Sequence, residues 1–236
     1  MKAPIILAVD TSDFDTAIAW IEATSDSVSV YKLGLEFFLN FGVEGVASVQ
    51  ERTGAEIFLD LKLHDIPHTV MGASLAIANL APKFLTVHAS GGSPMIRAAV
   101  DAIPATSITA VTILTSLSES NLFEIGFANP PLESAVALAK LAVSAGAKAL
   151  VCSPLETAAI RSALGPVPII ITPGVRPLDQ VGKDDQSRTM TPISAIAAGA
   201  DYVVIGRPIT QAWSDGAAAL KLRSRKIADE ILQSLA

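Results

Sequence analysis

The sequence predicts an α/β fold, a (β/α)8 barrel that takes up residues 1–236 as a single domain. Eight short apolar runs rich in β-branched residues recur along the chain, at a mean spacing of about 28 residues. Ala- and Leu-rich stretches with helical spacing separate them, as helices separate the strands of a parallel barrel. The first turn, residues 10–13 (DTSD), lacks the G-x-G-x-x-G motif that is typical of an open doubly wound sheet. No linker or low-complexity tract divides the chain.

The eight apolar runs are expected to be the strands. Most carry apolar residues on both faces, as strands between a barrel interior and a layer of helices do. In chain order they are residues 5–10, 28–34, 56–63, 84–90, 107–115, 149–154, 168–175 and 202–208. Residues 134–145 and 214–235 are examples of the helical segments that follow strands.

Several helix boundaries are also marked in the sequence. Ser93 and Thr191 each precede a proline, which places a capping hydroxyl before a proline at the first helical position. Gly146 and Gly199 each follow a helical run, where a glycine commonly ends a helix.

Composition limits the classes of function. The chain is 50% hydrophobic and 17% charged, which is far too apolar for a disordered protein. Its net charge is −6 and its pI is about 5.0, which argue against general binding to nucleic acid or to an anionic membrane surface. No segment approaches the ~18 apolar residues that span a bilayer, and the N-terminus shows no signal-peptide pattern.

The chain has one cysteine, Cys152, within an apolar run. One cysteine excludes an intrachain disulfide, and its setting is typical of a small buried side chain. We therefore expect a reducing, cytoplasmic location.

An acid and a base share one face of the third expected strand. Because side chains alternate along a strand, Asp60 and Lys62 point the same way as Phe58. A buried acid and base are costly unless they are paired. In a barrel this face points inward, and its last residues reach the catalytic mouth.

Charged or hydroxyl residues close other expected strands at the same rim. Asp10, Lys32, Thr115 and Arg207 lie at or near the C-terminal ends of the first, second, fifth and eighth strands. Each has an ordinary structural interpretation, such as a helix cap for Asp10 or a solvated strand end for Lys32. Asp60 and Lys62 would by themselves form a structural ion pair. Their convergence on one rim favours a catalytic site.

The histidines do not indicate a metal site. His64 and His68 are spaced i, i+4, but Pro67 lies between them and no H-E-x-x-H motif is present. His88 ends the fourth expected strand and is interpreted as a hydrogen-bonded residue of the mouth or core. We expect neither a metal nor an organic cofactor.

The end of the last strand indicates a phosphate site. Gly206 lets backbone N–H groups approach an anion, and Arg207 can clamp it with two hydrogen bonds. The loops after strands seven and eight form the recurrent phosphate site of such barrels. The long polar loop of residues 176–189, which carries Gln186, is placed to close over the phosphate.

Residues 60–69 (DLKLHDIPHT) resemble the D-x-K-x-x-D-I-P-x-T signature of the orotidine 5′-phosphate decarboxylase family. The resemblance extends from about Ile5 to Gln211, and further motifs agree in order and spacing. These are residues 7–10 (LAVD), 31–34 (YKLG), 114–116 (LTS), 172–177 (TPGVRP), 184–186 (DDQ) and 205–208 (IGRP).

The resemblance implies the conversion of orotidine 5′-phosphate to uridine 5′-phosphate and CO2, the last step of de novo pyrimidine synthesis. It implies a homodimer without metal or organic cofactor. It also implies that Lys62 protonates C6 and that Asp60 borders the substrate carboxylate. Asp65, with Ile66 and Thr69, would serve the partner's site.

The remaining roles follow from the same resemblance. Asp10 and Lys32 would hold the charge network and the ribose. The phosphate would be held by Arg176, Gln186, Gly206 and Arg207. Three hydroxyls, those of Thr115, Ser116 and Ser118, remain candidates for the contact to the pyrimidine.

Two alternatives compete with this interpretation. Related phosphate-binding barrels, 3-keto-gulonate-6-phosphate decarboxylase and hexulose-phosphate synthase, share the D-x-K-x-x-D motif but use magnesium and have a carboxylate where Lys32 stands. Lys32 and Gln186 argue against them. A non-catalytic nucleotide-binding barrel is the other alternative, and it does not require the buried charges of Asp60 and Lys62.

Overall fold

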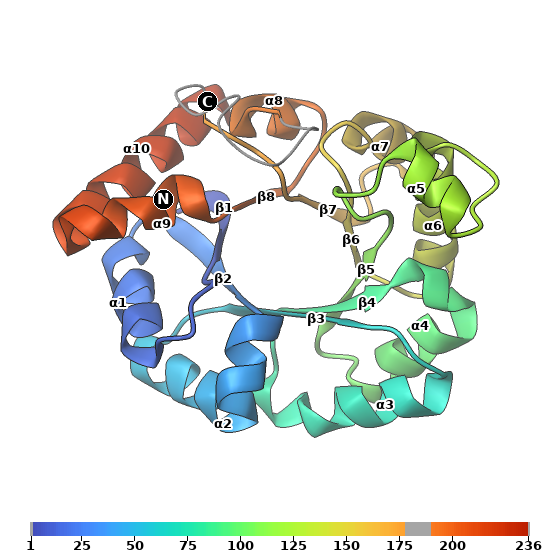
Figure 1. Cartoon of the computed structure of the whole chain (residues 1–236), viewed down its shortest axis with the longest axis horizontal. Coiled ribbons are helices and arrows are strands. Elements are labelled where there is room, and N and C mark those ends of the chain that lie inside the picture. Colours follow the sequence, from blue (N-terminus) through green and yellow to red (C-terminus); the bar gives the residue numbers. More distant parts are fainter. Residues whose placement is uncertain (1, 178–189, 236) are drawn as a thin grey trace.

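A computed structural model describes residues 2–177 and 190–235, and eight parallel strands within them form a closed barrel in chain order (Figure 1). The predicted (β/α)8 class is confirmed. The strands are β1 (Ala3–Ala8), β2 (Val28–Gly34), β3 (Ile57–Leu63), β4 (Phe84–His88), β5 (Ser107–Val111), β6 (Ala149–Val151), β7 (Ile169–Thr172) and β8 (Tyr202–Ile205).

Helices surround the barrel as an outer layer (Figure 1). They are α1 (Phe14–Thr24), α2 (Leu35–Thr53), α3 (Pro67–Ala76), α4 (Gly92–Ala102), α5 (Glu119–Glu124), α6 (Pro131–Ser144), α7 (Thr157–Leu164), α8 (Pro192–Ala197), α9 (Arg207–Thr210) and α10 (Ala217–Leu235). None of the described helices is long and apolar enough to cross a membrane.

Each expected strand is present, but most end earlier than predicted. Thr115 lies beyond β5, Asp10 lies beyond β1, and Arg207 is the first residue of α9. The early ends follow from the pairing: β5 is paired with β6 from Thr109 to Val111, and β6 itself ends at Val151. Asp10 and Thr115 therefore lie on loops that follow the strands, and Arg207 lies at the start of a helix.

The helix boundaries were predicted with mixed success. The Thr191 hydroxyl accepts a hydrogen bond from the Ser194 N–H at 3.1 Å, which confirms it as a helix cap. Gly146 and Gly199 adopt positive φ angles of 99° and 107° just after α6 and α8, as predicted. The prediction for Ser93 is wrong, because a short 3-10 helix leads directly into α4 and the helix already begins at Gly92.

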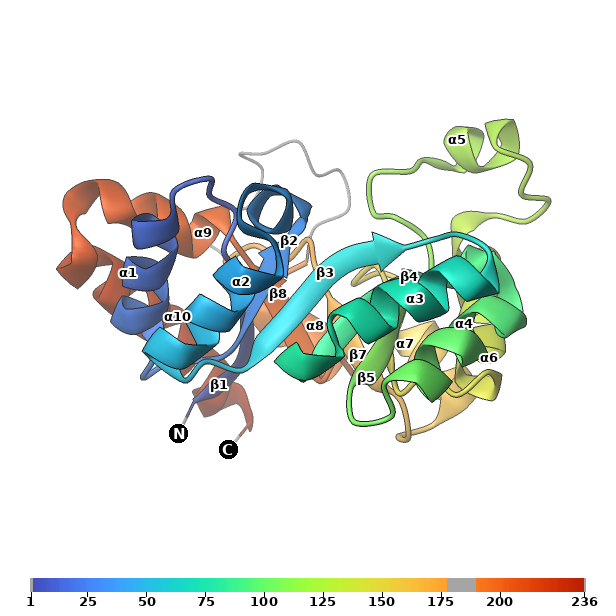
Figure 2. The same ribbon diagram turned by 90° about the horizontal axis from the view of Figure 1, so that it is seen from below.

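The core has two layers that together fix the position of the site. A small cluster fills the barrel interior, and it consists of Ile6, Val30, Phe58, Phe84, Ala149 and Ile171. A much larger cluster lies between the outward strand faces and the helices. Because the interior is filled by side chains, ligands have access at the ends of the strands rather than through the barrel. In Figure 2, α5 stands above one end of the barrel, on the side toward which β3 points.

Candidate active site

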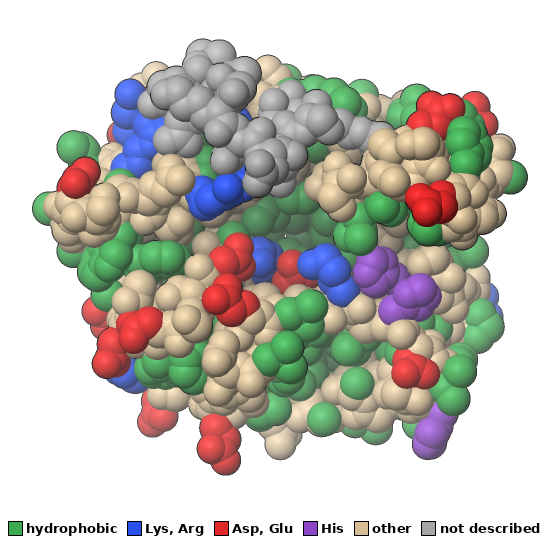
Figure 3. Space-filling model, viewed as in Figure 1, with side chains coloured by type: hydrophobic (Ala, Val, Ile, Leu, Met, Phe, Trp, Pro, Cys, Tyr) green, Lys and Arg blue, Asp and Glu red, His purple; other side chains and the backbone are tan. Residues whose placement is uncertain are grey.

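Charged side chains gather around a hollow at the C-terminal ends of the strands. In Figure 3, lysine or arginine, acidic and histidine side chains lie together at the centre of this face. A cavity of about 200 Å³ opens there. Its lining combines charged groups from β2 and β3 with apolar groups from the opposite side of the barrel: Lys32, Phe58, Asp60, Lys62, Val111, Ile113, Leu114, Thr115, Val151, Pro173 and Val204.

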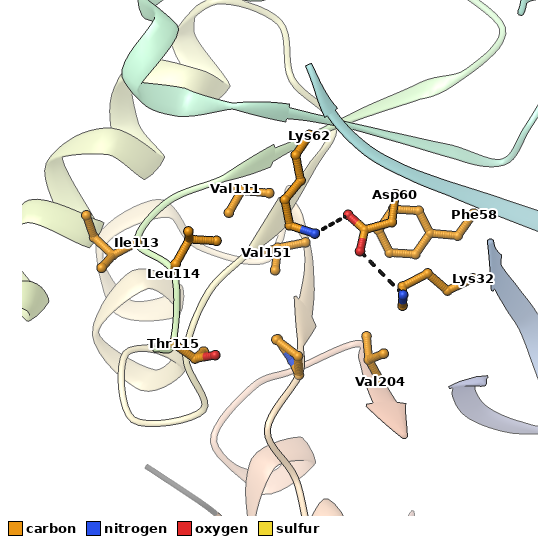
Figure 4. Close-up of a pocket in the computed structure, with 11 residues that line it drawn as sticks. Lys32, Phe58, Asp60, Lys62, Val111, Ile113, Leu114, Thr115, Val151 and Val204 are labelled. Atoms are coloured by element: carbon orange, nitrogen blue, oxygen red, sulfur yellow. Dashed lines mark hydrogen bonds and ion pairs between the residues drawn. The ribbon is translucent and has the colours of Figure 1, made fainter. Parts of the chain in front are cut away.

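One carboxylate sits between two lysines at the edge of this cavity (Figure 4). The Lys62 Nζ donates to Asp60 Oδ1 at 2.8 Å, and the Lys32 Nζ lies 3.6 Å from Asp60 Oδ2. The Lys32 Nζ also donates to Asp10 Oδ1 at 3.0 Å. As the alternation of side chains predicts, Phe58, Asp60 and Lys62 all face the cavity.

Asp60 is held in its charged form. Only 13% of its side-chain surface is exposed, and this burial alone would raise its pKa. The charges of Lys32 and Lys62, with hydrogen bonds from Lys62 and Thr86, outweigh burial and lower the pKa below its ordinary value of 3.8. The array therefore carries two positive charges and one negative charge near neutral pH.

The backbone around Lys62 is unusual for a strand. Lys62 has a φ of 48°, in the left-handed region that non-glycine residues rarely adopt. The register between β3 and β4 shifts over the same residues, between Leu59 and Leu63. The Thr86 hydroxyl accepts a hydrogen bond from the Lys62 N–H at 2.8 Å and donates one to Asp60 Oδ1 at 3.0 Å.

Thr86 is the contact that sequence reasoning missed. It lies on β4 between Phe84 and His88, two residues from each, and alternation places all three on the inward face. The signal in the sequence was a polar residue in the middle of the strand face that points into the barrel.

Two histidines adjoin the lysine side of the cavity. The rings of His64 and His88 lie 5.3 Å apart. Burial lowers the pKa of His88 below 6.5, and His64 and Lys62 lower it further. The lowered pKa favours the neutral imidazole of His88 at pH 7. Within residues 2–177 and 190–235, no group of three or more His, Cys, Asp or Glu is arranged to hold a metal.

Asp65, Ile66 and Thr69 lie past the end of β3 and are exposed. The Asp65 carboxylate accepts the N–H of Ile66 at 2.6 Å. No Lys or Arg of the described part of the chain lies within ion-pair distance of it. One chain thus brings together Lys32, Asp60 and Lys62 but leaves Asp65 outside the array.

Three of the expected phosphate residues lie in the described part of the chain, at the ends of the last two strands. Arg176 is 6% exposed, and its Nη1 donates to the Val175 carbonyl at 3.0 Å. Gly206 joins β8 to α9, and a Cβ there would lie 3.3 Å from the Cβ of Ala8. Arg207 follows at the start of α9. Gln186 lies outside the described residues.

The three candidate hydroxyls occupy different places. Thr115 lines the cavity. The Ser118 hydroxyl caps α5, where it accepts the Asn121 N–H at 3.2 Å. Ser116 lies in the turn between them and is absent from the cavity lining. The geometry favours Thr115 for a contact to a bound ring.

Comparison with known proteins decides the family. The sequence profile of the orotidine 5′-phosphate decarboxylase / HUMPS family matches residues 3–222. The chain belongs to this family. Orotidine 5′-phosphate decarboxylase of Thermobifida fusca is 53% identical over 222 residues, which cover 94% of this chain and 95% of that protein. The same enzyme of Gluconobacter oxydans is 47% identical, with 89% of this chain and 92% of that protein covered.

Solved structures agree with this assignment. The crystal structure of orotidine 5′-phosphate decarboxylase from Lactobacillus acidophilus superposes with a TM-score of 0.80 at 35% identity, over 96% of this chain and 99% of that one. The corresponding enzyme from Pyrococcus horikoshii gives a TM-score of 0.76 at 26% identity. Family membership covers the barrel, including every strand that contributes to the cavity.

The charge array predicts a specific titration. In Lys32→Met, the Asp60 carboxyl should titrate at a higher pH than in the wild type, because Lys32 is the largest of the influences that lower its pKa. The folded pKa lies below that of the unfolded chain, so ionised Asp60 adds stability above about pH 3.8. That stability is lost as the pH falls through the folded pKa, and Lys32→Met should reduce it.

The titration is measured by ¹³C NMR of the aspartate carboxyls, with Asp60→Asn to assign the signal. Arg52→Met is the matched control, because it removes an exposed cation whose ion pair with Asp15 includes no member of the array. An Asp60 titration unchanged in Lys32→Met would contradict the electrostatic account.

Proposed function

We propose that this chain is an orotidine 5′-phosphate decarboxylase that forms uridine 5′-phosphate and CO2 in pyrimidine synthesis. The observation that carries the proposal is the Lys32–Asp60–Lys62 array at the edge of an otherwise apolar cavity. The names of its closely similar relatives support the same reaction. One (β/α)8 catalytic domain suffices for it.

The array suits the chemical difficulty of the reaction. When the C6–CO2 bond breaks, its electron pair stays on C6 in a vinyl carbanion that no π-system delocalises. The ammonium of Lys62 stabilises this developing charge from a fixed position. A Nζ proton of Lys62 then bonds to C6, and the neutral amine regains a proton from solvent. Stabilisation that grows toward the transition state accelerates the step itself.

Asp60 has two tasks in this mechanism. Its ion pair with Lys62 at 2.8 Å orients the amine, and Lys32 on its other side keeps Asp60 ionised. It also borders the position of the substrate carboxylate. Lys32, Asp60 and Lys62 therefore act as one preorganised unit.

The rest of the substrate is held around the rim. Thr115 contacts the pyrimidine, and Asp10 with Lys32 holds the ribose. The phosphate is bound by Arg176, Gln186, Gly206 and Arg207. The phosphate is remote from C6, but the free energy of its binding can be used to lower the barrier to decarboxylation. The expected loop over the phosphate lies mostly outside the described residues.

The enzyme acts as a homodimer in which Asp65, with Ile66 and Thr69, completes the partner's site. The exposure of these residues and the absence of an ion pair between Asp65 and its own chain's described cations support this arrangement. Neither metal nor organic cofactor takes part. The location is cytoplasmic, in keeping with a single cysteine that is buried and whose pKa burial raises to about 12.

One assay tests the proposed function. The loss of orotidine 5′-phosphate absorbance is followed with purified enzyme in the presence of EDTA. We expect turnover that EDTA leaves unchanged. Turnover only with added magnesium and a sugar-phosphate substrate would favour the alternative of a 3-keto-gulonate-6-phosphate decarboxylase or hexulose-phosphate synthase. Binding without turnover would favour a nucleotide-binding protein.

The central role of Lys62 predicts a large loss in Lys62→Ala. Its kcat should fall by at least roughly four orders of magnitude, about 5–6 kcal/mol of activation free energy, because Lys62 carries the only ammonium group of β3 and Lys32 lies on the other side of Asp60. Binding of a uridine 5′-phosphate analogue should change much less. Lys83→Ala is the control, since Lys83 pairs with Glu56 at the opposite end of the barrel. A folded Lys62→Ala enzyme with near-normal turnover would remove Lys62 from this role.

The shared site predicts complementation between two inactive variants. Lys62→Ala and Asp65→Ala homodimers should each be nearly inactive. A mixed dimer has one site with both lesions and one with neither. Re-equilibrated mixtures should regain up to roughly a quarter of wild-type activity per subunit, because each site of a two-fold dimer draws on both chains. If a tagged-chain pull-down verifies exchange and no activity returns, Asp65 does not act across the interface.

A further inference from the structure

The pairing between β3 and β4 is interrupted beside the charge array. Leu59 pairs with Leu85, and the next pair is Leu63 with Val87. Three residues of β3 thus stand opposite one residue of β4, which is Thr86. Such a bulge leaves backbone groups without their ladder partners and redirects side chains. Here the bulged residues include Asp60 and Lys62.

The Thr86 hydroxyl bonds one backbone group of the bulge and one side chain. A hydroxyl has one proton to donate and lone pairs to accept with. The proton goes to Asp60 Oδ1 at 3.0 Å, and a lone pair accepts the Lys62 N–H at 2.8 Å. One buried hydroxyl therefore links the backbone of the proton donor to the carboxylate that orients its amine.

The two contacts act on different degrees of freedom. The bond to the Lys62 N–H supports a backbone with a φ of 48°, which costs free energy unless the surroundings hold it. The bond to Oδ1 fixes the carboxylate plane, because the Lys62 Nζ shares that oxygen while Lys32 faces Oδ2. Thr86 is fully buried and does not line the cavity.

We propose that Thr86 is a positioning residue that sets the placement of Lys62 and the charge of Asp60 through this bifunctional hydroxyl. Its effect on turnover rests on the proposed function, whereas its effect on Asp60 does not. Loss of the hydroxyl is expected to lower kcat far more than it raises KM, since Thr86 does not reach the cavity.

The adjacent strand supplies a matched control. Thr109 on β5 is the register partner of Thr86 and is equally buried. Its hydroxyl donates to the Ser107 carbonyl of its own strand at 3.0 Å. Thr109→Val therefore removes a buried barrel hydroxyl without touching the array.

The first experiment measures kcat and KM for Thr86→Val, Thr86→Ser and Thr109→Val with orotidine 5′-phosphate. Thr86→Val keeps the shape and removes the hydroxyl, and its kcat should fall about 10²-fold, the scale of a small misplacement of a catalytic group. Thr86→Ser keeps a hydroxyl, so its kcat should be much closer to the wild-type value than that of Thr86→Val. Thr109→Val should retain wild-type kinetics.

The second experiment titrates Asp60 by ¹³C NMR in the same proteins without substrate. Thr86→Val should raise the Asp60 pKa, because one hydrogen bond that lowers it is lost. The other charged and titratable groups around the array are Lys32 from β2, Lys62 on β3, Asp10 after β1, His88 at the end of β4 and His64. These are unchanged in the variants, so the shift reports Thr86.

The outcomes separate this proposal from the proposed function. A wild type without decarboxylase activity would defeat the proposed function, while the NMR titration would still decide the role of Thr86. A folded Thr86→Val enzyme with wild-type kcat and Asp60 titration would overturn the positioning role, as would equal losses in Thr109→Val. Should Thr86→Val not fold, Thr86→Cys replaces it, since a thiol is a weak donor and acceptor, and the same shifts are expected.

Discussion

Two ammonium groups share one buried carboxylate, and the site depends on keeping that arrangement fixed. Asp60 alone would be destabilised by burial, and Lys32 and Lys62 alone would repel each other. Together they form a unit with a net positive charge beside an apolar cavity. The barrel makes this possible because neighbouring parallel strands deliver β2 and β3 side chains to the same rim, above an interior already filled by aromatic and aliphatic groups.

The two sides of the cavity differ in polarity. Charged groups lie on the β2–β3 side of the cavity, whereas Val111, Val151 and Val204 supply an apolar wall from the other strands. The proposed reaction at a single carbon of a flat ring suits this one-sided polarity, because charges in a partly buried site interact more strongly than charges in bulk water.

Much of this organisation follows from sequence pattern alone. The eight β-branched runs predicted the strands, and alternation predicted that Asp60 and Lys62 share one face, which holds in the structure despite the bulge at these residues. Strand ends were overestimated, since pairing with a neighbour, which one strand's sequence does not encode, decides where a ladder stops. Thr86 was not predicted as a site residue, for a related reason. Threonine is an ordinary strand residue, and its importance comes from a register shift that exists only when β3 and β4 are paired.

At position 62, the residue types that best fit the left-handed backbone differ from the residue type that the proposed chemistry requires. Glycine or asparagine would adopt a φ of 48° with less strain than lysine does. Neither carries an ammonium group. Selection for stability alone would therefore push this position away from lysine, whereas the proposed role of Lys62 as proton donor gives a reason to keep it. On that proposal, a chain released from the need to catalyse should lose this lysine early.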